Sequence, residues 1–206
     1  MGKLYYIYGC MGSSKSAQLL ITAHSFEEKK IQFLCMKSCI DTRDGKDVIS
    51  SRIGICRGCI TVMKEDNLFD IISDYKDNNP DYKDLSWVMV DECQFLDEEQ
   101  IDQLAMVVDE LDVNVMCYGL RTDFTSHFFD GSRRLMEIAD TVTEIKSLCD
   151  CGRKAIVNAR VDGNGFIINR GEQIMIGGDD KYIPLCRHCY NKALNATAKA
   201  KEDVIY

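Results

Sequence analysis

The chain has 206 residues, of which 46% are hydrophobic. This suits one ordinary domain with a substantial core, or one domain with a small appendage. Its formal net charge of −8 argues against a protein that coats DNA or RNA, because such affinity comes from clustered lysines and arginines that neutralise phosphates. There is no run of about 18 apolar residues to span a bilayer and no recognisable secretory leader, so we expect a cytoplasmic protein that binds neither nucleic acid nor membrane.

Short apolar runs alternate with stretches of helical periodicity through most of the chain. Strands are expected at residues 4–8, 31–36, 87–90 and 113–118, and helices at residues 15–26 and 98–110. This alternation is typical of βαβ units, so it predicts an α/β fold with a mostly parallel sheet and flanking helices. The intervening residues 37–59 have no sustained period and are expected to form a long loop or hairpin.

The character of the sequence changes after about residue 148. The turn sequence DGNG at 162–165 separates two strand-like stretches, 155–161 and 166–170, and the Ala- and Lys-rich tail at 191–201 predicts a terminal helix. We therefore expect a main domain over 1–148 and a small C-terminal β domain over 149–206.

A phosphate loop is the first candidate functional element. The stretch GCMGSSKS matches G-x-x-x-x-G-K-[ST] except at Ser14, where the motif has glycine. In this motif backbone N–H groups converge on phosphate, the lysine reaches the outer phosphates and the final hydroxyl binds Mg²⁺. An ordinary Gly/Ser turn into a helix is the alternative that the string alone leaves open. The expected phosphate-binding residues are Gly9, Cys10, Met11, Gly12, Ser13, Ser14, Lys15 and Ser16.

The stretch WVMVDECQF predicts a strand that ends in two acids, Asp91 and Glu92. A strand-terminal acid beside a phosphate loop can bind Mg²⁺, as the Walker B acid does, and a second carboxylate can accept a proton from a hydroxyl nucleophile. Adjacent residues of a strand point in opposite directions, so the two acids need different roles. The pair alone is a weak signal, because a helix beginning at 96–98 would also favour acids nearby.

The chain has 11 cysteines, an odd number that suits reduced thiols better than a disulfide framework. Three of them lie in or beside apolar segments, where a free thiol packs as a small hydrophobe: Cys35, Cys93 and Cys117. The pair Cys56 and Cys59 has metal-ligand spacing, but we expect two unpaired thiols on a hairpin there.

Two further cysteine pairs flank the predicted C-terminal hairpin. Cys149 and Cys151, together with Cys186 and Cys189, offer four thiols for a tetrahedral Zn²⁺ at its base. The first pair has the spacing C-x-C, which is a looser signal than C-x-x-C, and His188 competes for the place of the fourth ligand.

Several longer stretches resemble thymidine kinases of the family that includes bacterial and animal cytosolic enzymes, and most closely its bacterial subgroup. The matches run in order nearly from end to end. Besides the phosphate loop they are IDTR (40–43), SSRIG (50–54), VDECQFL (90–96), CYGLRTDF (117–124), CDCGRKA (149–155) and IGGDDKYIPLC (176–186). The resemblance implies a P-loop parallel sheet and a small zinc-ribbon-like domain with a lasso loop.

The resemblance also implies an activity, the transfer of the γ-phosphate of ATP to the 5′-hydroxyl of thymidine, with deoxyuridine as a plausible second substrate. Glu92 would be the base that takes the proton from this hydroxyl. Arg43, with Asp41 near it, would stabilise charge at the transferring group, and Gln94 would belong to the nucleotide site. Ser16 and Asp91 would hold Mg²⁺ with the ATP phosphates.

The family's nucleoside pocket implies a second set of residues. Flat apolar walls suit a thymine ring, and backbone groups of a Gly-rich lid segment could hydrogen-bond its edge. The matching positions in this chain are Met11, Phe95, Leu120, Phe124, Phe129, Met175, Gly177 and Tyr182.

The resemblance resolves the zinc ligands and leaves two other functions to weigh. It implies Cys189 rather than His188 as the fourth ligand of a structural zinc, and it carries over a homotetramer and feedback by thymidine triphosphate. One alternative is a catalytically impaired nucleoside-binding or nucleotide-binding protein of the same fold, because of Ser14. A zinc-ribbon nucleic-acid binder is the other, and the negative charge disfavours it.

Overall fold

The computed structural model describes residues 1–42, 45–173 and 181–202. Its centre is a six-stranded sheet in the order β5-β2-β6-β7-β1-β8, with every neighbouring pair parallel. The predicted α/β class with a mostly parallel sheet is therefore confirmed. The strands are β1 (Leu4–Gly9), β2 (Phe33–Ser38), β5 (Ile60–Val62), β6 (Trp87–Asp91), β7 (Asn114–Gly119) and β8 (Thr141–Ile145).

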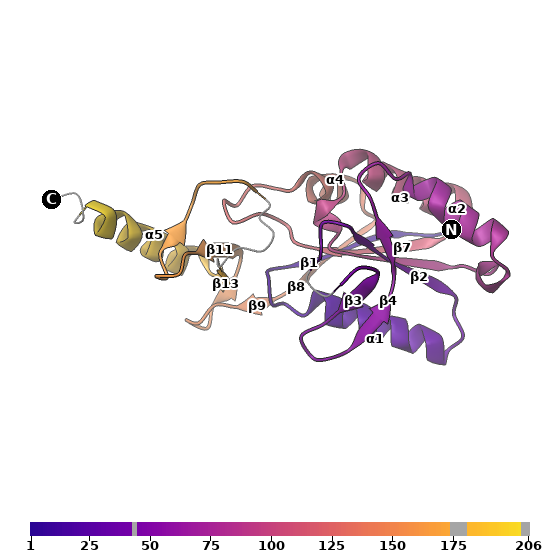
Figure 1. Cartoon of the computed structure of the whole chain (residues 1–206), viewed down its shortest axis with the longest axis horizontal. Helices are drawn as coiled ribbons and strands as arrows, with labels where there is room; N and C mark the ends of the chain where they lie inside the picture. The colour runs from indigo at the N-terminus through magenta and orange to yellow at the C-terminus, as the bar shows by residue number, and fades with distance from the viewer. Residues whose placement is uncertain (43–44, 174–180, 203–206) are drawn as a thin grey trace.

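Helices cover both faces of this sheet (Figure 1). Helix α1 (Lys15–Glu28) lies on one face, and α2 (Leu68–Asn78), α3 (Glu98–Leu111) and α4 (Asp130–Ile138) lie on the other. Each face has its own apolar cluster of buried side chains. Continuous apolar strands such as WVMV are the expected sequence of a parallel sheet that is buried on both sides.

Side-chain caps explain where α2 and α3 begin. The Asp97 side chain accepts a hydrogen bond from Gln100 N at 2.9 Å, and the Asn67 side chain accepts one from Asp70 N at 3.2 Å. These side chains satisfy backbone donors that have no partner within the first turn of a helix. Two short 3₁₀ turns, η1 (Pro80–Tyr82) and η2 (Cys93–Phe95), precede and follow β6.

The segment predicted as a long loop or hairpin contains an antiparallel hairpin. Its strands are β3 (Val48–Ser50) and β4 (Cys56–Gly58), and at its tip Ser51 N donates to Ile55 O at 3.0 Å. The hairpin leaves the carboxyl end of β2 before the chain returns to the sheet as β5. Its tip is therefore at the edge of the sheet where the phosphate loop lies.

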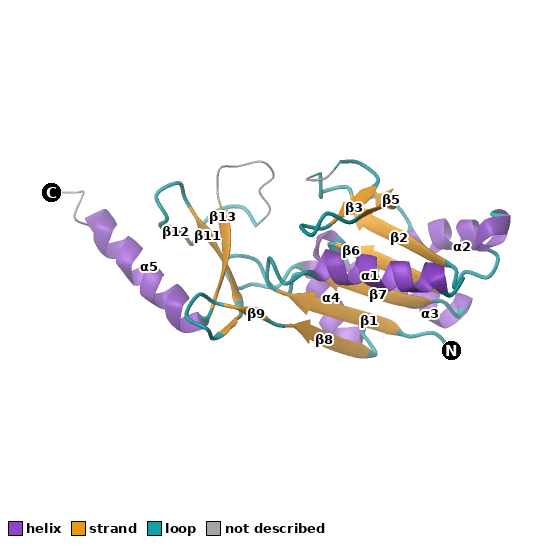
Figure 2. Cartoon of the chain, turned by 90° about the horizontal axis from the view of Figure 1, so that it is seen from below, coloured by secondary structure: helices purple, strands orange, loops and turns teal. Residues whose placement is uncertain are grey.

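The C-terminal unit, which comprises residues 147–173 and 181–202, is built from short antiparallel strands and one helix (Figure 2). Strand β9 (Ser147–Leu148) pairs with β10 (Lys154–Ala155), and β11 (Val157–Val161) lies between β12 (Ile167–Ile168) and β13 (Lys181–Leu185). The predicted turn at Asp162 joins β11 to β12. Helix α5 (Arg187–Glu202) begins a few residues before the predicted terminal helix. None of the helices in the described ranges is both long and apolar enough to cross a membrane.

Candidate active site

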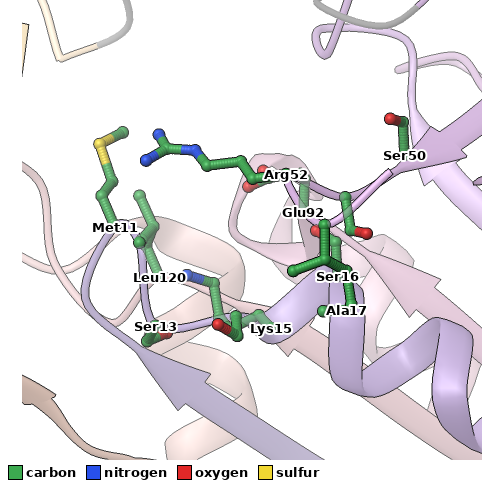
Figure 3. Close-up of a pocket in the computed structure, with 13 residues that line it drawn as sticks. Met11, Ser13, Lys15, Ser16, Ala17, Ser50, Arg52, Glu92 and Leu120 are labelled. Carbon is green, nitrogen blue, oxygen red and sulfur yellow. The ribbon is translucent and has the colours of Figure 1, made fainter. Parts of the chain in front are cut away.

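A pocket lies at the carboxyl edge of the parallel sheet, where β1, β6 and β7 end beside one another (Figure 3). This edge is the usual place for ligands in open parallel sheets, because the loops that leave adjacent strands converge there. Four parts of the chain line the pocket: residues 11–17 of the phosphate loop, residues 50–53 of the hairpin tip, Glu92 and Leu120.

The phosphate loop has the backbone geometry that its motif predicts. Gly12 has φ 73°, and Ser14, at the N-terminus of α1, has φ 67° and ψ 28°. Ser14 therefore adopts the left-handed conformation for which glycine is normally selected. The Lys15 side chain is 8% exposed, and its Nζ donates to Gly9 O at 3.2 Å and to Cys10 O at 3.1 Å. The lysine is thus held inside the curve of the loop.

Glu92 lies just beyond β6 and faces this pocket. Its φ of 50° turns the chain out of the strand, so the orientations of Glu92 and Asp91 are not set by strand alternation, contrary to the expectation from sequence. Gln94 Nε2 donates to Glu92 Oε2 at 2.6 Å, and Gln94 Oε1 accepts from Leu120 N at 2.9 Å. Gln94 therefore orients the carboxylate, although it is not itself among the residues that line the pocket.

Asp91 is the last residue of β6 and is 3% exposed. Burial, together with the neighbouring Glu92 carboxylate, raises its pKa to about 7, while Ser16 and Lys15 act in the opposite direction. Its Oδ1 is buried and has no hydrogen-bond partner within the described ranges. A buried carboxylate oxygen with unused acceptor capacity beside a hydroxyl is a suitable donor set for a divalent cation. These residues therefore fit Mg²⁺.

The loop after β2 brings Asp41 close to a lysine that sequence reasoning missed. Lys37 is 1% exposed, and its Nζ donates to Gly45 O at 2.8 Å and lies 3.8 Å from Asp41 Oδ2. The predicted catalytic residue Arg43 lies outside the described residues. Lys37 directly follows the apolar run at residues 33–36 of β2 and precedes only the last residue of this strand, so a charged residue at the end of a buried strand could have marked it.

The predicted nucleoside-binding residues have different surroundings in the structure. Met11 and Leu120 line the pocket beside Glu92, as expected. Phe95 and Phe129 pack edge to face with ring centroids 6.0 Å apart, and the buried Phe124 ring lies under the Arg160 guanidinium at 5.2 Å. Tyr182 is half-buried in β13, opposite Arg160. Met175 and Gly177 lie outside the described residues.

Two other residues at this site were not assigned a role from sequence. Arg52 extends from the hairpin tip across the pocket toward Met11 (Figure 3), and a Cβ built on Gly12 would lie 3.9 Å from its Nη1. It brings a second cation into the neighbourhood of Lys15. Asn158 of β11 is buried and accepts a hydrogen bond from Met11 N at 2.8 Å. The motif SSRIG could have indicated Arg52, whereas no local pattern indicated Asn158.

The four predicted zinc ligands lie together. The sulfurs of Cys149, Cys151, Cys186 and Cys189 are all within 4.8 Å of one another. Backbone N–H groups of Cys151 and Cys186 lower the pKa of Cys149 to about 7, whereas the three neighbouring sulfurs raise that of Cys189 to about 12. The surroundings thus favour the thiolate form of Cys149 and oppose that of Cys189. A bound cation would stabilise the thiolate form of all four cysteines, so the cluster fits Zn²⁺. His188 is exposed and is not part of the cluster.

The other predicted cysteines have different surroundings. Cys56 is exposed and Cys59 is half-buried, and burial raises the pKa of Cys59 to about 11. Neither belongs to a group of potential metal ligands in the part of the chain that the structure describes. The three cysteines predicted to pack in the core are all buried, as expected: Cys35, Cys93 and Cys117.

A comparison of the sequence with protein-family models and with curated proteins finds the same family in both cases. A family model described as thymidine kinase matches residues 2–190. A thymidine kinase of Zymomonas mobilis is 44% identical over 95% of this chain and 100% of its own length. The thymidine kinase of Shewanella oneidensis is 43% identical over 91% of this chain and 95% of its own, and that of Vibrio cholerae 40% identical over 94% and 99%.

Proposed function

The chain belongs to the thymidine kinase family, as its sequence motifs predict, and from this we propose that it transfers the γ-phosphate of ATP to the 5′-hydroxyl of thymidine. Deoxyuridine is proposed as a second substrate. One observation carries the proposal: the phosphate loop with Lys15 and the carboxylate of Glu92 line the same pocket. Phosphoryl transfer requires mainly that a cationic phosphate site and a proton acceptor be positioned together.

Each residue then has a stated task. The backbone N–H groups of residues 9–16 and the Lys15 ammonium hold the phosphates. Glu92 accepts the proton of the 5′-hydroxyl as this oxygen attacks the γ-phosphorus, and Gln94 keeps the carboxylate turned toward the substrate. Arg43 stabilises the charge of the transferring group, with Asp41 fixing its loop. When bound, Mg²⁺ held by Ser16 and Asp91 neutralises phosphate charge.

The nucleoside is proposed to lie beyond Glu92. Met11 and Leu120 form the near walls, and the rings of Phe95, Phe124 and Phe129 enclose the base. The segment with Met175 and Gly177 supplies backbone hydrogen bonds to the edge of the base, and Tyr182 contacts its outer side. These assignments follow the family resemblance position by position.

The remaining properties are proposed for the whole protein. Zinc on the cysteine cluster is structural, because four protein ligands leave no coordination position for water. We propose residues 1–148 as the nucleotide-binding domain and 149–206 as the zinc-bearing domain. A cytoplasmic homotetramer that is inhibited by thymidine triphosphate is carried over from the family.

The impaired-protein alternative is not favoured. Lys15, Ser16, Asp91 and Glu92 are all present, and Gln94 orients the carboxylate. Ser14 adds backbone strain and a small side chain to the loop, but it removes none of these charged and polar groups.

Transfer of labelled phosphate from ATP to each common deoxynucleoside and to deoxyuridine tests the proposal. We expect Glu92→Gln to lower turnover by about two to four orders of magnitude while thymidine affinity, measured by equilibrium binding, is unchanged. Glu110→Gln is the matched control, because it neutralises an exposed carboxylate at the far end of α3. Nearly unchanged turnover in Glu92→Gln would remove Glu92 as the base, and the lack of any transfer by the wild type would overturn the proposed function.

A further inference from the structure

Asn158 is a buried polar side chain that the C-terminal unit contributes to the phosphate loop. Its Oδ1 accepts from Met11 N at 2.8 Å, and its Nδ2 donates to Thr122 O at 3.0 Å. The side chain is 3% exposed and comes from β11, 147 positions along the chain from Met11. One amide thus joins the loop after β1 to the loop after β7.

The bond to Met11 fixes one peptide plane of the phosphate loop. The carbonyl of that peptide is Cys10 O, which accepts from Ser13 N at 3.1 Å and from Lys15 Nζ at 3.1 Å. In a planar trans peptide the C=O and the N–H point in opposite directions. Asn158 therefore holds the outer side of the peptide whose inner side positions the lysine and closes the turn.

The bond to Thr122 ties the same amide to the loop that carries Leu120. Leu120 N donates to Gln94 Oε1, and Gln94 in turn donates to Glu92. A continuous chain of hydrogen bonds and short backbone segments therefore runs from the phosphate loop through Asn158 to the carboxylate. The side-chain amide offers both a donor and an acceptor, whereas a leucine side chain offers neither, so Leu cannot replace either bond.

We propose that Asn158 is a positioning residue for ATP: it sets the orientation of the Cys10–Met11 peptide and thereby the place of the Lys15 ammonium. It touches no reacting atom, and it acts through the loop. The inference rests on the proposed function, because it assigns the occupant of this loop as the triphosphate of ATP.

The chain provides a matched control at the opposite edge of the sheet. Asn114, the first residue of β7, makes the same two kinds of bond: its Oδ1 accepts from Lys3 N at 3.1 Å and its Nδ2 donates to Ser86 O at 3.2 Å. Asn158→Leu and Asn114→Leu each remove one donor and one acceptor from backbone partners. Only the first lies at the phosphate loop.

The experiment compares the two variants by ATP and thymidine saturation, thermal melting and equilibrium binding of a fluorescent ATP analogue. We expect Asn158→Leu to raise the apparent KM for ATP by about tenfold, which corresponds to about 1.4 kcal/mol, with a smaller change for thymidine. Asn114→Leu should lower the melting temperature but leave both KM values unchanged. Threonine is compatible with a β-strand, and its hydroxyl can replace one of the two hydrogen bonds. The apparent KM for ATP of Asn158→Thr should therefore lie between those of wild type and Asn158→Leu.

If Asn158→Leu, Asn158→Thr and Asn114→Leu have the same apparent KM for ATP and the same affinity for the analogue, the proposal is overturned and Asn158 has a structural role only. If Asn158→Leu does not fold, the comparison of Asn158→Thr with wild type decides in the same way. Analogue binding separates the two hypotheses. Wild type that binds the analogue but transfers no phosphate contradicts the proposed function, while weaker binding by the Asn158 variants still supports the positioning role.

Discussion

Replacing Ser14 by glycine should stabilise the folded protein. Ser14 has φ 67° and ψ 28°, a left-handed conformation that costs an L-residue about 1–2 kcal/mol. Glycine removes this cost, but its freedom in the unfolded chain cancels about 0.4–1 kcal/mol of the gain. The free energy of unfolding should therefore rise by about 0.5–1 kcal/mol, which for a chain of this size is about 1–4 °C in melting temperature.

Ser126 provides the control, because it has the same φ of 67° and lies exposed outside the phosphate loop. Thermal and denaturant unfolding should show a similar gain for Ser14→Gly and Ser126→Gly. Strain that the folded chain carries in both free and ATP-bound forms cancels from KM. Only Ser14→Gly should lower the apparent KM for ATP, by up to about tenfold, through removal of a side chain beside the phosphates. A destabilised Ser14→Gly next to a stabilised Ser126→Gly would refute the strain argument.

Three further outcomes follow from the site. Cys149→Ser should lose zinc and melt at lower temperature, because metal-binding energy contributes to folding. Cys56→Ser should retain the zinc content and the melting temperature of the wild type. Equal zinc loss in the two variants, measured by atomic absorption, would contradict the ligand assignment. Asp91 has a folded pKa of about 7 against an ordinary value of 3.8. The folded chain binds the extra proton, so without added Mg²⁺ stability should fall as pH rises through this interval, and Asp91→Asn should flatten the fall in unfolding midpoints. Phe124→Leu should raise KM for thymidine more than KM for ATP, and the reverse order in saturation curves would remove it from the nucleoside wall.

The sequence predicted those elements whose pattern is local and strong. Strands β1, β6 and β7 are apolar runs of ordinary length, and α3 has a clear cap at Asp97 and a regular apolar face. Strand β5 was missed because it has three residues, too few for a period. Strand β8 was missed for another reason: as an edge strand it exposes Thr141, Val142 and Thr143, so it does not read as a buried run.

The residues of the candidate site also differ in how far the sequence could predict them. The phosphate loop and the acid pair could be found because each is a contiguous motif placed directly after a strand. The spacing of the cysteines indicated a zinc cluster, but the family resemblance was needed to choose Cys189 over His188 as the fourth ligand. Lys37, Gln94 and Asn158 have roles that depend on groups brought together by the fold, and in the case of Asn158 those groups are on two different loops. No window of sequence contains that information.

The C-terminal unit contacts the main domain not only through its chain connection but also through side chains that follow it, among them Asn158. Strand β8 pairs with β1 and is joined to β9 by one residue. Asn158 of β11 then hydrogen-bonds to the loops that follow β1 and β7. A unit joined only through its linker can be exchanged between related proteins by recombination at that linker, whereas a unit with further contacts has to keep those contacts compatible as well. A chimaera joined at residue 148 would therefore need to inherit the amide on β11 and its two backbone partners from compatible parents.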